Sequence, residues 1–134
     1  MAQVIIYSQS NGKVAVCMPT GELPIEEVLA KDTPLGSIIV DTNDLPNEHS
    51  NFFDAWELNG TTVTVNFNKA VLITKDRLRI EREPLLAAQD ILYIRAIEQN
   101  QNTNAIVAEK QRLRDITILA DQANTLNELR LLSA

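Results

Sequence analysis

The chain has 134 residues and a formal net charge of −6 at pH 7, and aromatic residues make up only 4% of it. This length suits one domain or two small lobes, and a core of that size needs neither a disulfide nor a metal for folding. The acidic balance argues against non-specific nucleic-acid binding, which requires a basic surface. The single cysteine, Cys17, cannot form an internal disulfide, which fits a reducing compartment.

The sequence carries no signal for secretion or membrane insertion. It contains no run of about 20 apolar residues, the length that spans a bilayer, and its start lacks the basic and apolar regions of a secretory signal. We therefore expect a cytoplasmic protein, or a component of a viral particle made in the cytoplasm, that contacts neither membranes nor nucleic acids.

The N-terminal half is predicted to form antiparallel strands and one short helix. Residues 3–7 and 13–18 are rich in β-branched and apolar side chains, and the Asn-Gly pair between them favours a hairpin turn. Pro24 suits the first position of a helix over residues 24–31, and the glutamates that follow favour a helix N-terminus. Residues 37–41 are expected to form a third strand.

A polar loop and a second hairpin follow. The loop covers residues 42–51, and the aromatic residues at 52–56 are expected to anchor it onto the lobe. Residues 57–65 alternate threonine with valine after Asn59-Gly60, which predicts two strands joined by a turn at that pair.

From about residue 67 the apolar pattern becomes helical. Pro84 interrupts the first arm, and because an internal proline costs about 3 kcal/mol we expect the helix to kink or to break there. The second arm is predicted to start near Thr103 or Asn104, both able to cap a helix, and to run to about Ala120. A threonine at 125 with a glutamate three residues later has the capping-box spacing and predicts a short C-terminal helix.

These elements predict an α+β fold with two lobes. Residues 1–66 form a small N-terminal antiparallel β-rich lobe with one short helix, and residues 67–134 form a C-terminal helical hairpin.

Two apolar rows run along the first arm, and each advances by seven residues. One row comprises Val71, Leu78, Leu85 and Leu92, and the other comprises Ile73, Ile80, Ala87 and Ile94. The rows lie about 200° apart on a helix with 3.6 residues per turn, so the arm must be covered on two sides. The second arm, with Ile106, Leu113 and Ala120, can cover one side. The other side requires the N-terminal lobe or another protein, and in the latter case we expect a homo-oligomer.

The arginines of the two arms have two interpretations. Arg77 and Arg79 on the first arm, and Arg112 and Arg114 on the second, lie among acidic residues. They can form ion pairs on a solvated helix face, which contribute about 0 to 1 kcal/mol each. They can also bind carboxylates of a partner protein in the bidentate manner typical of arginine.

A search for catalytic chemistry in the sequence gives little. The only histidine, His49, lies in a polar loop without a second histidine or a cysteine cluster at metal-ligand spacing. Cys17 lies in a predicted apolar strand without a basic neighbour, which favours a buried side chain over a nucleophile. We expect no enzyme, no cofactor and no metal, although a pocket that joined Asp41, Asp44 and His49 would favour an enzyme.

Several short motifs spread over the chain have counterparts in a known group of proteins. In the first half they include Leu23-Pro24-Ile25-Glu26-Glu27 and Phe53-Asp54-Ala55-Trp56-Glu57. In the second half they include Lys75-Asp76-Arg77-Leu78-Arg79 and Lys110-Gln111-Arg112-Leu113-Arg114-Asp115-Ile116-Thr117. The motifs resemble those of small proteins encoded in the tail region of double-stranded DNA bacteriophages. The second half resembles the helical-hairpin end of tail-fibre assembly proteins and phage tail assembly chaperones.

The resemblance implies a non-enzymatic tail protein that binds the tail fibre or the baseplate. It would act in tail-fibre assembly or remain as an adaptor in the particle, and it would be found in the virion tail or in the host cytoplasm during assembly. The alternative is a regulatory module that binds a peptide or a small ligand at the edge of the N-terminal sheet. An unpaired edge of the first strand would favour that alternative.

Overall fold

The computed structural model describes residues 2–134, which divide into two compact units with the boundary after Ala70. The first unit contains two antiparallel sheets and the second is helical, so the predicted α+β class is confirmed. The boundary lies inside helix α2 (Phe67–Glu98), a few residues after the position expected from the sequence. No helix within residues 2–134 is both long enough and apolar enough to cross a lipid bilayer.

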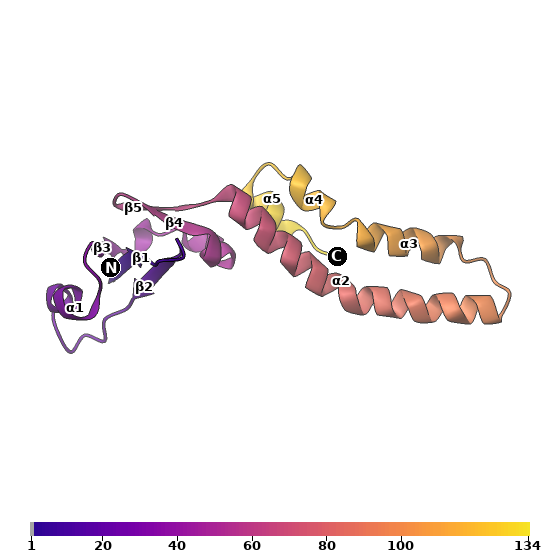
Figure 1. The fold of residues 1–134 in the computed structure, drawn as a ribbon, viewed down its shortest axis with the longest axis horizontal. Coiled ribbons are helices and arrows are strands. Elements are labelled where there is room, and N and C mark those ends of the chain that lie inside the picture. The colour runs from indigo at the N-terminus through magenta and orange to yellow at the C-terminus, as the bar shows by residue number, and fades with distance from the viewer. Residues whose placement is uncertain (1) are drawn as a thin grey trace. The chain divides into compact units, whose positions relative to one another are not determined.

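The N-terminal unit contains both predicted hairpins, the third strand and the short helix (Figure 1). One sheet has the order β2 (Val14–Cys17), β1 (Gln3–Ser8), β3 (Ile38–Asp41), and the other pairs β4 (Trp56–Asn59) with β5 (Thr62–Val65). Helix α1 (Ile25–Asp32) packs over β1 and β3. Pro24 precedes α1 with an extended ψ of 144°, so the helix begins one residue later than predicted.

Strand β1 is buried on both faces because the core cluster covers one face and α1 packs over the other. Alternate residues of a strand point to opposite faces. Val4 and Ile6 pack in the core cluster together with Val14, Trp56 and Val63, which joins the two sheets. Ile5 is also fully buried and points the other way, to the face over which α1 packs. A strand covered on both sides explains why this segment reads as a continuous apolar run.

The second hairpin turns one residue later than predicted. Asn59 pairs with Thr62, so the loop consists of Gly60 and Thr61. Gly60 has φ +64°, a conformation that glycine adopts without the strain of a Cβ atom, and glycine is preferred at the first loop position of a type II′ turn. Asn59 instead belongs to β4, where its side-chain amide donates to the Thr64 hydroxyl at 2.6 Å.

The polar loop folds as two 3₁₀ segments, Thr42–Asp44 and Asn47–Ala55. The Trp56 indole N–H donates to the carbonyl of His49 at 3.2 Å, and Phe52 is buried. These contacts tie the loop to the lobe in the way that the aromatic cluster predicted.

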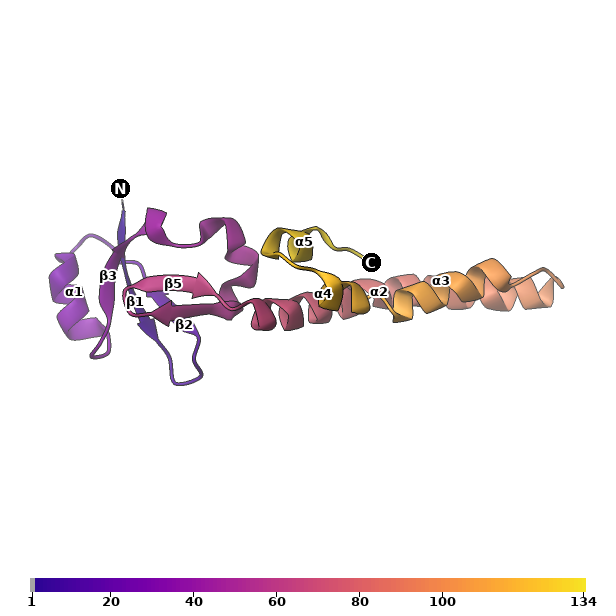
Figure 2. The same ribbon diagram turned by 90° about the horizontal axis from the view of Figure 1, so that it is seen from above.

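The second unit consists of α2, α3 (Asn104–Arg114), α4 (Ile118–Gln122) and α5 (Leu126–Leu131). Figures 1 and 2 both show α3 running back alongside the later part of α2. Helix α2 ends in a Schellman motif, in which Asn100 has φ +54° and the N–H of Gln101 donates to the carbonyl of Ala96 at 2.8 Å. The polar run after α2 is therefore a helix end followed by a reversal of the chain.

Pro84 bends α2 and does not break it. The helix is continuous over its whole length with the proline inside it, and Figure 1 shows it changing direction about midway. A proline ring displaces the carbonyl of the preceding turn and removes one hydrogen bond, which accounts for a bend at this place.

The prediction of one second arm ending near Ala120 is wrong. Helix α3 ends at Arg114, and a turn over Asp115 precedes the separate helix α4. Ile116 lies in this turn and is buried, so the chain leaves the helical path to place an apolar β-branched side chain in the core. The C-terminal helix is confirmed, and the Thr125 hydroxyl accepts from the N–H of Glu128 at 3.1 Å.

Candidate functional site

Asp41 and His49, two of the three residues that could have formed a catalytic pocket, make local contacts in the N-terminal unit. The Asp41 carboxylate accepts from the N–H of Asn43 at 2.9 Å and caps the first 3₁₀ segment. The His49 ring stacks at an angle near Phe52, with 6.5 Å between ring centroids, and its Nε2 lies 3.7 Å from a carboxylate oxygen of Glu48. Among residues 2–134, no group of three or more His, Cys, Asp or Glu side chains could hold a metal ion.

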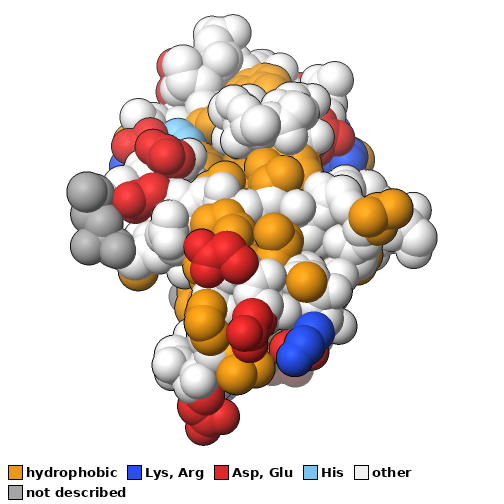
Figure 3. Space-filling view, turned by 90° about the vertical axis from the view of Figure 1, so that its left-hand side faces the viewer, with side chains coloured by type: hydrophobic (Ala, Val, Ile, Leu, Met, Phe, Trp, Pro, Cys, Tyr) orange, Lys and Arg blue, Asp and Glu red, His pale blue; other side chains and the backbone are white. Residues whose placement is uncertain are grey.

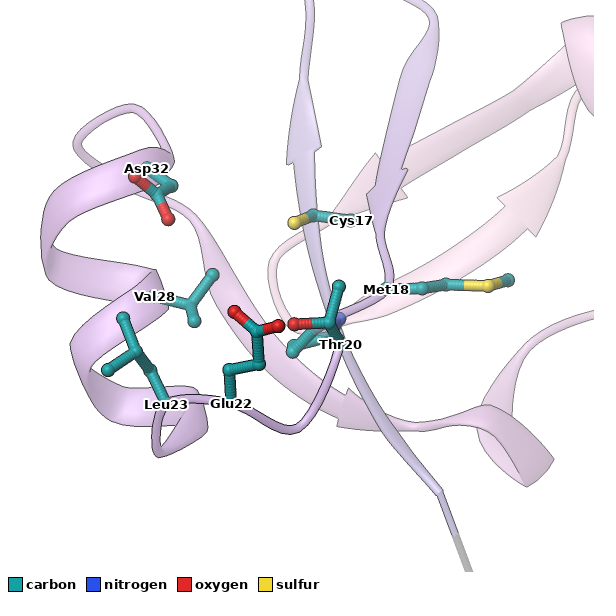
Figure 4. Close-up of a pocket in the computed structure, with 8 residues that line it drawn as sticks. Cys17, Met18, Thr20, Glu22, Leu23, Val28 and Asp32 are labelled. Atoms are coloured by element: carbon teal, nitrogen blue, oxygen red, sulfur yellow. The ribbon is translucent and has the colours of Figure 1, made fainter.

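A shallow hollow of about 260 Å³ lies between the end of β2 and α1 (Figure 4). Its lining comprises Cys17, Met18, Pro19, Thr20, Glu22, Leu23, Val28 and Asp32. Cys17 is half-buried, and not fully buried as the sequence suggested. The lining carries two carboxylates and no cationic side chain, so it offers no group that would hold an anionic substrate.

The surface of the N-terminal unit mixes apolar and acidic side chains. Figure 3 shows a face of this unit on which hydrophobic side chains lie among aspartates and glutamates. Leu35 and Met18 are two of its largely exposed apolar residues. They lie in separate loops and do not form a continuous row along one helix or strand.

The interior of the helical unit is formed along one side of α2. Thr74, Leu78 and Ala96 are buried there. The other helices contribute Leu113, Ile116, Ala120 and Leu129, all of them buried. Of the apolar residues predicted to face inward from the second arm, Leu113 and Ala120 are buried and Ile106 is half-buried.

The row Val71, Leu78, Leu85 and Leu92 is not the inner side of α2. Leu78 is buried, but Leu85 is 41% exposed and Leu92 is 44% exposed. A straight helix turns by slightly less than two full turns in seven residues, so a strict heptad row drifts by about 20° per step. Drift alone does not explain the exposure of Leu92, because this residue lies 18 residues, or about five full turns, after the buried Thr74. Beyond Pro84 the covered residues of α2 are Leu86, Gln89, Tyr93 and Ala96, which lie about 70° around the helix from Leu85 and Leu92.

The second predicted row lies on the opposite side of α2 and is largely uncovered. Ile80 is 72% exposed, Ile94 is 57% exposed, and Ala87 between them is exposed as well. Ile73, nearer the start of the helix, is half-buried. With a rotation of about 100° per residue, the centre of this exposed side lies roughly 150° around the helix from the buried Thr74, Leu78 and Ala96.

Two residues that we did not assign to this row complete it. Pro84 and Ile91 are exposed and fall between the others, so that the apolar positions alternate in steps of four and three. We call the resulting line the outer seam, and it comprises Ile80, Pro84, Ala87, Ile91 and Ile94. The sequence signal that identifies the complete line is the alternation of four-residue and three-residue steps. This alternation indicates a coiled-coil contact more specifically than a single row with a seven-residue step.

Most of the arginines singled out in the sequence form ion pairs within the chain. Arg79 lies 2.7 Å from Asp76, and Arg112 lies 2.7 Å from Glu109. Arg77 lies 2.8 Å from Glu81 and also donates to the carbonyl of Leu129 at 3.1 Å. The guanidinium of Arg77 therefore holds the end of α5 against α2.

The Arg114 side chain is exposed, and the backbone carbonyl of this residue accepts from Arg82 at 2.8 Å. Arg82 belongs to the same basic run of the first arm as Arg77 and Arg79. Its guanidinium also approaches the carbonyl of Leu113 at 3.4 Å. Arg82 thus satisfies carbonyls at the C-terminus of α3, where a cation is favoured by the helix dipole.

Two lysines make equivalent links elsewhere along α2. Lys110 on α3 lies 2.6 Å from Asp90 and 5.1 Å from the centroid of the Tyr93 ring. Lys75 lies 2.7 Å from Asp121 on α4. Side chains of α2 therefore contact each of the other helices of this unit.

Glu81 is the carboxylate with the most contacts in this network. The hydrogen bond from Arg77, together with one from the N–H of Ala134, lowers the pKa of Glu81 below its usual value. The ionised carboxylate accepts both bonds, so it connects α2 to the last residue of the chain.

The sequence matches no protein-family model, and no curated protein or solved structure is significantly similar to it.

Proposed function

We propose that this chain is a non-enzymatic bacteriophage tail protein that binds a tail-fibre or baseplate protein through its helical unit. The observation that carries the proposal is the outer seam, an uninterrupted apolar line on the open side of α2. Contiguous exposed apolar residues of this kind are typical of protein-binding surfaces. The phage assignment is supported by the sequence motifs, above all Lys75-Asp76-Arg77-Leu78-Arg79 at the start of the hairpin.

The protein would act in one of two ways. As an assembly factor it would cover an apolar surface of the fibre until the fibre is complete, and it would then leave. As an adaptor it would stay in the mature tail between fibre and baseplate. Both roles require a stable helical platform, and the links from α2 to α3, α4 and α5 provide one.

Mass spectrometry of purified particles, together with affinity purification of the tagged chain from cells that produce them, tests the proposal. Stoichiometric presence in the particles would identify an adaptor. Absence from the particles combined with co-purification of the fibre would identify an assembly factor. If no tail component co-purifies and the particles lack the chain, the proposal is wrong.

The alternative function, a regulatory module that binds a peptide or ligand at the edge of the N-terminal sheet, lacks the unpaired first strand that would favour it. Strand β1 pairs with β2 on one side and with β3 on the other. Its N–H and carbonyl groups are therefore used within the sheet, whose edges are formed by β2 and β3.

A further inference from the structure

We propose that the outer seam binds one amphipathic helix of a partner protein, and that this helix carries lysine or arginine on the side that faces Glu83. The inference rests on the proposed function, since it names the chemical class of partner that a tail protein with this surface would bind. It also excludes a second copy of this chain as the occupant.

The spacing of the outer seam fits a helix better than an extended peptide. Its residues alternate in steps of four and three, which places them on one narrow edge of α2. From Ile80 to Ile94 the edge is about 21 Å long at 1.5 Å per residue. The small side chains of Pro84 and Ala87 lie between the isoleucines, so a partner helix can approach closely at the middle and insert its own apolar residues there.

The flank of the outer seam is acidic on one side. Asp76, Glu83 and Asp90 also step by seven residues and lie about 60° around the helix from the seam. These are the positions at which coiled coils select partners by charge. Asp76 and Asp90 pair with Arg79 and Lys110, respectively. Glu83 is exposed and has no ion pair or hydrogen bond among the described residues, so it leaves an uncompensated negative charge beside the middle of the seam.

A second copy of the chain would be a poor occupant. If two copies of α2 paired in opposite directions, their acidic flanks would face each other, and like charges in such positions repel. If they paired in the same direction, Asp76 would face Glu81 of the other copy, Glu83 would face the uncharged Ala88, and only Asp90, which is already paired with Lys110, would face a basic residue, Arg95. A helix with basic residues on its flank meets no such repulsion and supplies the missing counter-charge for Glu83.

A synthetic peptide tests the inference with the full-length chain. The probe is a fluorescein-labelled peptide of three heptads with isoleucine and leucine at the apolar positions and lysine at the flanking positions. A matched peptide carries glutamate in place of every lysine. In fluorescence anisotropy titrations at low salt, the lysine peptide should bind at least tenfold more tightly. At an ionic strength of about 1 M, where the Debye length is about 3 Å, the difference should shrink.

Two pairs of variants locate the site. Ile91→Gln should weaken binding of the lysine peptide at least tenfold, whereas Leu92→Gln, its neighbour of similar exposure off the seam, should have little effect. Glu83→Lys should reduce the preference for the lysine peptide at least fivefold. Glu27→Lys, the same charge change on α1, controls for the general acidity of the chain and should leave the preference nearly unchanged.

Several results would overturn the inference. Equal binding of the two peptides, or no binding of either, would show that the outer seam does not select a basic helix. Equal effects of Ile91→Gln and Leu92→Gln would place the peptide elsewhere. A dimer in light scattering that Ile91→Gln converts to a monomer would make a second copy the occupant. The peptide assay uses no phage component, so its failure would leave the result of the particle experiment unaffected. In the same way, failure to find a tail component in the particle experiment would not alter peptide binding.

Discussion

Leu78 and Leu85 occupy the same heptad row of α2, and truncating each of them tests whether the row was assigned correctly. Leu78 is fully buried, whereas Leu85 is 41% exposed. Removing a buried leucine side chain to alanine costs about 2–5 kcal/mol, because both the transfer energy and the cavity contribute. Leu85→Ala removes a side chain that is already partly hydrated, so it should cost about 1 kcal/mol or less.

Urea denaturation followed by circular dichroism at 222 nm measures this difference, since the helices dominate that signal. With an m-value of about 1–2 kcal/mol/M, Leu78→Ala should lower the unfolding midpoint by at least about 1 M, and Leu85→Ala by much less. Fluorescence of Trp56, which lies in the core of the N-terminal unit, reports separately on that unit. Equal midpoints for the two variants would refute the argument that the row leaves the core beyond Pro84.

Three further predictions concern the ends of the helical unit and one turn. Thr125→Ala removes the N-cap of α5 and should cost about 0.5–2 kcal/mol locally, seen as faster amide exchange in that helix. The lowered pKa of Glu81, caused first by Arg77, means that its contribution is complete above the usual pKa of about 4.3 and is lost as the pH falls through the folded-state pKa. After correction for the slower intrinsic exchange in acid, the protection factors of amides at the C-terminus should therefore fall as the pH is lowered, and Glu81→Gln should abolish that dependence. Gly60→Ala places a Cβ atom at φ +64° and should destabilise the N-terminal unit by about 1 kcal/mol, measured by Trp56 fluorescence.

The N-terminal unit could be predicted from the sequence because local signals decide its elements. Asparagine-glycine pairs mark both hairpins, and Pro24 marks the start of α1 to within one residue. The pairing of β1 with β3 could not be read in the same way, because the contact depends on segments far apart in the chain and carries no local signature. That pairing is what removes the free edge of the first strand.

The helical unit was predicted less well because tertiary contacts override its local pattern. The second arm reads as one helix through residue 120, yet the burial of Ile116 and the capping of α3 by Arg82 end that helix early. The capping arginine comes from a distant turn of α2, so no window of the sequence contains both partners. Pro84 gave a clear signal of disturbance, but only the structure distinguishes a bend from a break.

The outer seam shows why apolar periodicity alone cannot separate a core from an interface. Leu78 and Ile80 are two residues apart, both are large and apolar, and both belong to rows of the same step. One is fully buried and the other is 72% exposed, a difference set by which side of α2 receives α3, α4 and α5. Leu113, Ile116, Ala120 and Leu129 of those helices are buried on that side, and Arg77 and Lys110 add polar links across it. This packing leaves the opposite apolar line open, and the Glu83 carboxylate beside it gives that line the proposed preference for basic partners.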